Sequence, residues 1–174
     1  MTNARYTIRN TTKPRGFEVI TAEGQVLAVM CQPRFFSRDM EGTIGDSAVR
    51  IVSEGFWRMR YGVFIDEARV GTVSTVAWGQ LKWALSLSAQ PHVELRFTTV
   101  GPWHRHYQLQ VTKDHPLLTV VSKFHWATFS TTYTVEIVGA GISADQMPLM
   151  LVLAGFSANL KRARAHAAGS AAGT

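Results

Sequence analysis

The chain has 174 residues, of which 46% are hydrophobic and 17% charged, ordinary proportions that argue against both intrinsic disorder and a polytopic membrane protein. Its length fits one domain with a substantial core, and the even spread of apolar segments marks no internal boundary. The formal net charge of +6 favours anionic partners such as phosphates, lipid headgroups or acidic proteins.

Cysteine usage and the first residues bear on the cellular compartment. Cys31 is the only cysteine, so no internal disulfide can form, and no basic segment followed by an apolar one opens the chain. The cytoplasm is therefore the expected location. Because Cys31 ends an apolar segment, we expect its thiol to be buried and unreactive.

Alternation of apolar and polar residues with period two dominates the chain from Tyr6 to Val138, as in strands with one wet face. Turn-prone groups such as "AEG", "EGTIGD" and "TKDHP" separate the alternating segments. About a dozen strands favour a closed barrel or a sandwich, since long open sheets curl or split. In chain order, strands are expected at residues 5–9, 16–20, 26–30, 48–53, 57–65, 69–76, 80–87, 92–99, 106–111, 117–124 and 132–138, with a shorter strand around 35–36.

The segment "DQMPLMLVLAGFSANL" lacks this alternation and predicts a helix. Asp145 suits the N-cap, and Pro148 suits the first turn. From Leu149 to Leu160 the residues are apolar or small on every side, which is typical of a helix enclosed by protein or lipid. Roughly 15 residues give about 22 Å, short of the roughly 30 Å hydrocarbon core of a bilayer. We therefore expect a helix over about residues 146–160 that fills the lumen of a barrel.

The residues after this helix change in character. Residues 161–174 are first basic and then rich in Ala, Gly and Ser, so we expect a disordered tail. Its cations, Lys161, Arg162 and Arg164, are candidates for membrane contact, each worth about 1 kcal/mol near an anionic surface. The alternative is that they only end the helix and keep the tail soluble.

Three stretches carry a family resemblance: "YTIRNTTKPRGFEVITAEGQVLAVM", "AVRIVSEGFWRMRYGVFIDEARVGTVS" and "LLTVVSKFHWATFSTTYTVEIVGAGISADQMPLMLVLAGFSANL". In segment order and hydrophobic pattern the chain resembles the tubby-like superfamily, most closely its LURP-one-related and phospholipid-scramblase-like branch. The resemblance implies one tubby-like domain over residues 1–160, a closed twelve-stranded antiparallel barrel around a central C-terminal helix. The expected fold class is therefore mainly β.

The resemblance implies more than one function, because members of the superfamily differ in what they do. Tubby domains bind phosphoinositides, scramblases are linked to lipid movement and calcium, and LURP-one-related proteins mostly lack a defined biochemistry. Scramblases are expected to carry a cysteine-rich segment and an acidic calcium-binding stretch near the helix. Here Cys31 is the sole cysteine and Asp145 the sole acidic residue between Gly139 and Leu160, so calcium-dependent scrambling is not expected.

No pattern in the chain indicates catalysis. A phosphate-binding glycine loop, a nucleophile elbow, a zinc-binding cysteine pair and a His-Glu helix motif are all missing from the sequence, so we expect neither an enzyme nor a cofactor. His104 and His106 are spaced as two metal ligands on a strand. Because no third ligand can be identified, we interpret them as part of a polar surface, and "DMEGTIGD" as a solvated turn without calcium ligands.

Basic residues on alternating strands are the main binding candidates. Arg58, Arg60, Lys82 and Arg96 should point away from the core, on successive strands if the order is a meander. Side chains on one face of adjacent strands are close enough to form a patch that contacts phosphate groups. The alternative is a solvated basic exterior with Glu94 and Glu136 interspersed.

The leading functional hypothesis is a noncatalytic module that binds anionic, phosphoinositide-like lipid headgroups through peripheral membrane association. One alternative is a structural or adaptor subunit that binds a protein partner; another is a scramblase-like lipid-handling protein whose helix leaves the barrel. Nucleic acid is not expected, because no RNA-binding signature accompanies the possible stacking platforms, which are Trp78, Trp83, Trp103 and Trp126.

Overall fold

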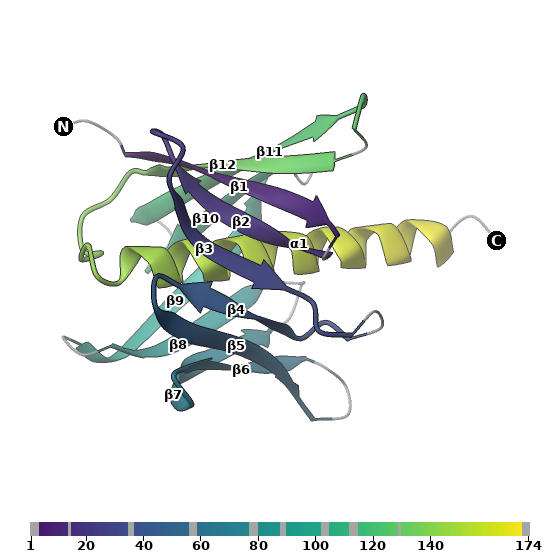
Figure 1. Cartoon of the computed structure of the whole chain (residues 1–174). Coiled ribbons are helices and arrows are strands. Elements are labelled where there is room, and N and C mark those ends of the chain that lie inside the picture. The colour runs from purple at the N-terminus through teal and green to yellow at the C-terminus, as the bar shows by residue number, and fades with distance from the viewer. Residues whose placement is uncertain are drawn as a thin grey trace.

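The computed structural model describes residues 4–13, 15–34, 37–55, 59–76, 80–87, 90–101, 105–111, 115–128 and 130–171. Within these residues, twelve strands precede one helix, α1 (Figure 1). The strands are β1 (Arg5–Thr12), β2 (Arg15–Thr21), β3 (Val26–Cys31), β4 (Met40–Ile44), β5 (Ser47–Glu54), β6 (Arg60–Ile65), β7 (Ala68–Thr75), β8 (Leu81–Leu87), β9 (Gln90–Val100), β10 (His106–Gln110), β11 (Pro116–His125) and β12 (Ser130–Ile137). The helix α1 spans Met147–Ala171.

The strands form one closed antiparallel meander. Each strand pairs with its neighbours in the chain, and β1 closes the ring by pairing with β12, with Tyr6 opposite Val135 and Ile8 opposite Tyr133. Closure removes the unpaired edges that an open sheet would present. The predicted closed barrel of about twelve strands around a C-terminal helix is thereby confirmed.

One strand lies where the sequence indicated a turn. Residues 40–44 of "DMEGTIGD" form β4, and only Gly45 and Asp46 make the turn to β5. Gly42 permits this strand, because a Cβ there would collide with the carbonyl oxygen of Val29 on β3. The shorter strand expected around Phe35 and Phe36 lies outside the described residues.

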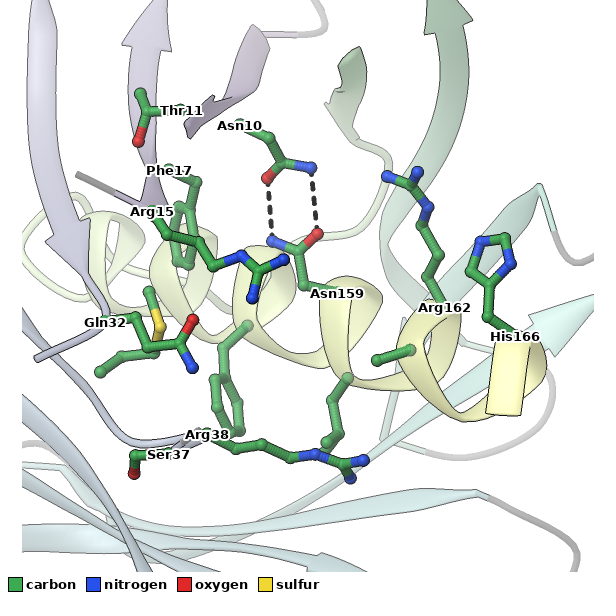
Figure 2. A pocket seen from close by; sticks show the side chains of 15 residues that line it. Asn10, Thr11, Arg15, Phe17, Gln32, Ser37, Arg38, Asn159, Arg162 and His166 are labelled. Carbon is green, nitrogen blue, oxygen red and sulfur yellow. Dashed lines mark hydrogen bonds between the residues drawn. The ribbon is translucent and has the colours of Figure 1, made fainter. Parts of the chain in front are cut away.

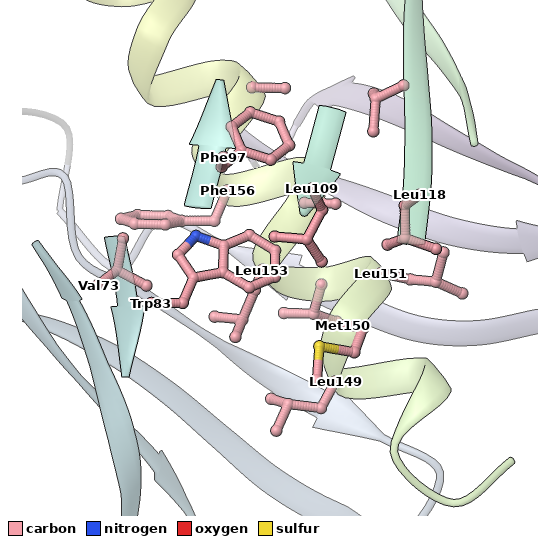
Figure 3. Close-up of a cluster of buried hydrophobic side chains, with 14 of the residues drawn as sticks. Val73, Trp83, Phe97, Leu109, Leu118, Leu149, Met150, Leu151, Leu153 and Phe156 are labelled. Carbon is pink, nitrogen blue, oxygen red and sulfur yellow. The ribbon is translucent and has the colours of Figure 1, made fainter. Parts of the chain in front are cut away.

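The helix fills the lumen (Figure 3). From Leu149 to Ala158 its side chains are buried on all sides against the inward faces of the strands. The indole N–H of Trp83 donates to the Ser157 hydroxyl at 3.1 Å, and Phe156 packs edge-on against Tyr61 with centroids 5.0 Å apart. Gly155 lets α1 approach the wall, since a Cβ there would lie 2.9 Å from the Phe17 ring. An all-round apolar helix is stable here because it is enclosed by protein.

The helix extends further than the sequence indicated. It begins at Met147, close to the expected start, but continues to Ala171, so residues 161–171 are helical where a disordered tail was predicted. Hydrogen bonds from Lys161 and Arg164 to the barrel, described below, hold the first turn of this extension. Among the described residues, no helix combines the length and the apolarity needed to cross a membrane. Cys31 is half-buried at the end of β3 rather than fully buried.

The two ends of the barrel differ. We name the end where α1 leaves the barrel the exit mouth, and the opposite end the far end. Because the strands are antiparallel, the connections β1–β2, β3–β4, β5–β6, β7–β8, β9–β10 and β11–β12 lie at the exit mouth, and the remaining connections at the far end. Figure 1 shows the C-terminal turns of α1 extending past the strand ends at the exit mouth.

Candidate functional site: the basic cleft at the helix exit

A cleft of about 580 Å³ opens beside α1 at the exit mouth (Figure 2). Its walls are the end of β1, the start of β2, the segment before β4, and α1. Its volume lies within the range of small-molecule sites. Apolar, polar and basic side chains line the cleft, in the set Asn10, Thr11, Arg15, Gly16, Phe17, Gln32, Ser37, Arg38, Met40, Phe156, Asn159, Leu160, Arg162, Ala163 and His166.

Three guanidinium groups from different elements line this cleft. Arg15 comes from the start of β2, Arg38 from the segment before β4, and Arg162 from α1, with His166 one turn further along the helix. Figure 2 shows Arg15 and Arg38 above and below the cleft in that view, with Arg162 and His166 towards the C-terminal part of the helix. None of the described lining residues is an Asp or a Glu, so the local field is positive.

A polar network fixes the inner part of the cleft. The side-chain amides of Asn10 and Asn159 exchange two hydrogen bonds, at 3.1 and 2.9 Å, and the Tyr133 hydroxyl donates to Asn159 Oδ1 at 2.9 Å. Burial raises the pKa of Tyr133, and the Arg162 guanidinium opposes that rise. The network joins β1, β12 and α1, so it holds the helix in register with the wall.

The cations predicted to lie in a free tail are instead attached to the barrel. Lys161 Nζ donates to Thr99 Oγ1 at 3.0 Å, and Arg164 Nη1 donates to Thr75 Oγ1 at 2.7 Å. Burial lowers the pKa of both side chains. Repulsion by Arg38 lowers the pKa of Arg164 further, so cations from α1 and the β3–β4 segment share one field.

The outer-wall candidates are brought together as the alternation indicated. Arg60 on β6, Lys82 on β8 and Arg96 on β9 lie in one row across the wall, with Ser74 of β7 between the first two. Carboxylates interrupt this row: Arg60 Nε lies 3.3 Å from a Glu54 oxygen, and Lys82 Nζ lies 2.6 Å from Glu94 Oε1. Hydrogen bonding by Lys82 lowers the pKa of Glu94. Arg58 lies outside the described residues.

The remaining candidates do not form a site. His104 lies outside the described residues, and His106 is exposed at the start of β10. In the described part of the chain, no group of three potential metal ligands occurs. Of the proposed stacking platforms, Trp83 is buried in the core and Trp126 is exposed, whereas Trp78 and Trp103 lie outside the described residues.

Sequence reasoning missed most of the cleft. Arg15 belongs to the turn-prone group "KPRG", and Arg38 follows the short strand expected around Phe35 and Phe36. Neither position carries a signal of a shared site. Asn10 and Asn159 are 149 positions apart, and only barrel closure brings them together. Arg162 was selected from the sequence, but as part of a tail.

Comparisons with known proteins do not assign a family. No family model matches the chain, and no curated protein matches it in sequence. An X-ray structure of a protein from Arabidopsis thaliana is similar, with 14% sequence identity and a TM-score of 0.49, covering 86% of this chain and 89% of that one. A likeness of this degree carries no conclusion about ligand or partner.

Proposed function

We propose that this protein is a noncatalytic binding module whose exit-mouth cleft holds an anionic lipid headgroup at a membrane surface. The observation that carries the proposal is the convergence of Arg15, Arg38 and Arg162 on one cleft whose described lining contains no carboxylate. Guanidinium groups bind phosphate oxygens in a bidentate manner and are the side chains best suited to that task. The resemblance to the tubby-like superfamily, in which tubby domains bind phosphoinositides, supports the same ligand class.

The distribution of charge along the barrel axis also supports the proposal. Within the described residues of the connecting segments, the far end carries five carboxylates and no Lys or Arg, whereas the exit mouth carries four cations and one carboxylate. Such a separation orients a protein toward an anionic surface. The far-end set is Glu23, Asp46, Asp66, Glu67 and Asp145; the exit-mouth set is Lys13, Arg34, Arg38, Arg105 and, as the carboxylate, Asp39.

Under this proposal the protein binds peripherally to an anionic membrane leaflet, such as the cytoplasmic one. The scramblase-like alternative fits less well, because α1 would have to leave the lumen and expose the apolar side chains that the barrel now encloses. The adaptor alternative remains the competing outcome of the experiment below.

Two triple charge reversals test the proposal. In one variant Arg15, Arg38 and Arg162 become Glu; in the matched control Arg60, Lys82 and Arg96 become Glu, with the same change in net charge on the outer wall. Binding is measured by cosedimentation with neutral and phosphoinositide-containing vesicles across a salt series, and by calorimetry with soluble inositol phosphates. We expect the cleft variant to lose binding and the control to keep most of it, and we expect salt to weaken binding.

The contrary results are equally definite. Loss of binding only in the wall variant would place the site on the outer row and overturn the cleft assignment. If the unmodified protein binds neither the vesicles nor the inositol phosphates, the headgroup proposal fails and a protein partner becomes the better hypothesis. Circular dichroism spectra of both variants show whether each remains folded.

A further inference from the structure

Exposed apolar side chains form an arc around part of the exit mouth. Met59 precedes β6, Val76 follows β7, Val100 ends β9, and Phe124 and Trp126 lie at the end of β11. We name these five residues the apolar arc. The basic cleft occupies the side of the mouth formed by β1 to β4, and the apolar arc the side formed by β6 to β11. The basic cleft and the apolar arc therefore lie on different sides of the mouth, with Arg105 of the β9–β10 connection on the side of the arc.

The composition of the arc distinguishes it from ordinary surface apolar residues, which occur singly on most proteins. Trp126 is 77% exposed and packs edge-on against Phe124 with ring centroids 5.0 Å apart. At the far end, the exposed large apolar side chains of the described residues are three valines: Val26, Val111 and Val138. Tryptophan is enriched where one part of a side chain meets water and another meets lipid.

The amino-acid sequence of the exit-mouth connections shows the same bias. The segments that join β5 to β6, β7 to β8, and β9 to β10 contain Trp57, Trp78 and Trp103, which lie outside the described residues. The segments at the far end contain no Phe, Tyr or Trp in their sequence. Among the described residues, the exposed aromatic side chains Phe124 and Trp126 lie at the same end as the cations.

The end of α1 is compatible with contact at a bilayer surface. Its last turns extend past the strand ends (Figure 1). Residues 165–171 of α1 include no Lys, Arg, Asp or Glu, so this part of the helix brings none of these charges into the headgroup region.

We infer that the exit mouth docks end-on onto an anionic phospholipid bilayer, with the apolar arc entering the interface and the basic cleft facing the phosphates. The inference rests on the proposed headgroup function and adds the orientation and the apolar anchors. Charge complementarity favours a phospholipid bilayer as the partner. Its phosphates can bind the cations, and the boundary of its acyl chains can accept the exposed aromatic groups beside them. The far end, with its carboxylates, then faces away from the membrane.

A fluorophore at a single position tests the orientation. In a Cys31→Ser background, Trp126→Cys is labelled with the environment-sensitive dye NBD, and Val111→Cys, at an exposed position of the far end, is the matched control. Vesicles of phosphatidylcholine with phosphatidylserine and a phosphoinositide are then added. We expect a blue shift and a rise in emission at position 126, and no change at position 111.

A second pair of variants separates anchoring from headgroup binding. Met59→Ser with Trp126→Ser should weaken vesicle affinity by roughly tenfold or more, as loss of two interfacial apolar groups implies. Val26→Ser with Val111→Ser should leave it unchanged. Affinity for soluble inositol phosphates should be the same in both variants and in the unmodified protein.

Each outcome discriminates between the two proposals. If inositol phosphates and vesicles bind but the label at position 126 stays unchanged, or if both labels respond alike, end-on docking is wrong and the headgroup function stands. If the label at position 126 responds but inositol phosphates do not bind, the headgroup function falls and the docking face stands. If inositol phosphates bind but vesicles do not, end-on docking alone is wrong. If neither binds, both proposals are overturned and a protein partner at the mouth becomes the better hypothesis.

Discussion

The outer-wall row and the exit-mouth cleft contain the same kinds of side chain in opposite settings. On the wall, Arg60 and Lys82 lie beside carboxylates of neighbouring strands, because the pleat places residues of adjacent strands on one face at short range. In the cleft, Arg15 comes from the start of β2 and Arg162 from α1, and none of the described lining residues is an Asp or a Glu. A sheet surface tends to place opposite charges side by side, whereas the end of a barrel can collect cations from distant parts of the chain.

The largest expected effect is a loss of folding stability when a polar residue of the cleft is replaced, compared with a residue of the outer wall. Asn159→Leu removes the partner of Asn10 and of the buried Tyr133 hydroxyl, which should lower the free energy of unfolding by about 1–3 kcal/mol. Lys82→Ala removes an exposed ion pair on the wall and should change it by less than about 1 kcal/mol. Urea unfolding followed by circular dichroism measures both; equal losses would mean that the network does not hold α1 to the wall.

An intermediate effect is expected when the wall is made to resemble the cleft. Glu54→Gln with Glu94→Gln removes the carboxylates beside Arg60 and Lys82. At low salt this variant should bind anionic vesicles about fivefold more tightly, as roughly 1 kcal/mol of added attraction implies.

The matched control for that change is Glu18→Gln with Glu136→Gln, which alters net charge equally but acts on pairs with Arg9 and Arg5 elsewhere on the wall. Cosedimentation at low and high salt compares the two variants. A similar gain in both would show that total charge, rather than the row, governs attraction to the vesicle.

A pH dependence of stability is expected at the mouth end of the core. Burial raises the pKa of Tyr107 to about 12, above the value of about 10 for an exposed tyrosine. A raised pKa in the folded state means that the stabilising contribution is complete below pH about 10 and is lost as pH rises toward about 12. Phenolate absorbance of the protein minus that of Tyr107→Phe should give the midpoint; a midpoint near 10 would contradict burial of this hydroxyl.

The barrel and its central helix were predictable because they rest on short-range patterns. Alternation marks most strands directly, and the all-round apolar segment after Met147 marks a helix that needs an enclosure. β4 was missed because its glycine and acidic residues resemble a turn, although Gly42 there serves close packing against β3. The helix end was missed because residues 161–171 have a tail-like composition, and hydrogen bonds to Thr75 and Thr99 are invisible in sequence.

The candidate site was predictable only in part. The sequence correctly indicated that Lys82 and Arg96 lie on neighbouring strands, but β7 separates Arg60 on β6 from Lys82 on β8, and the three share one row through Ser74. Glu54, whose carboxylate interrupts the row, was not identified because it lies at the end of β5, outside the strands that carry the row. The cleft forms because β1 pairs with β12 and because α1 lies at a particular depth in the lumen. Neither the pairing nor the depth can be predicted from a short stretch of sequence.

Closure of β1 on β12 also governs how this protein is made. The first strand leaves the ribosome more than a hundred residues before its partner, and α1, which fills the lumen, is synthesised after every strand. No earlier fragment can bury the inward faces of its strands, so folding must follow synthesis of the helix rather than accompany translation. The inward faces of the strands therefore stay exposed until the helix has been synthesised.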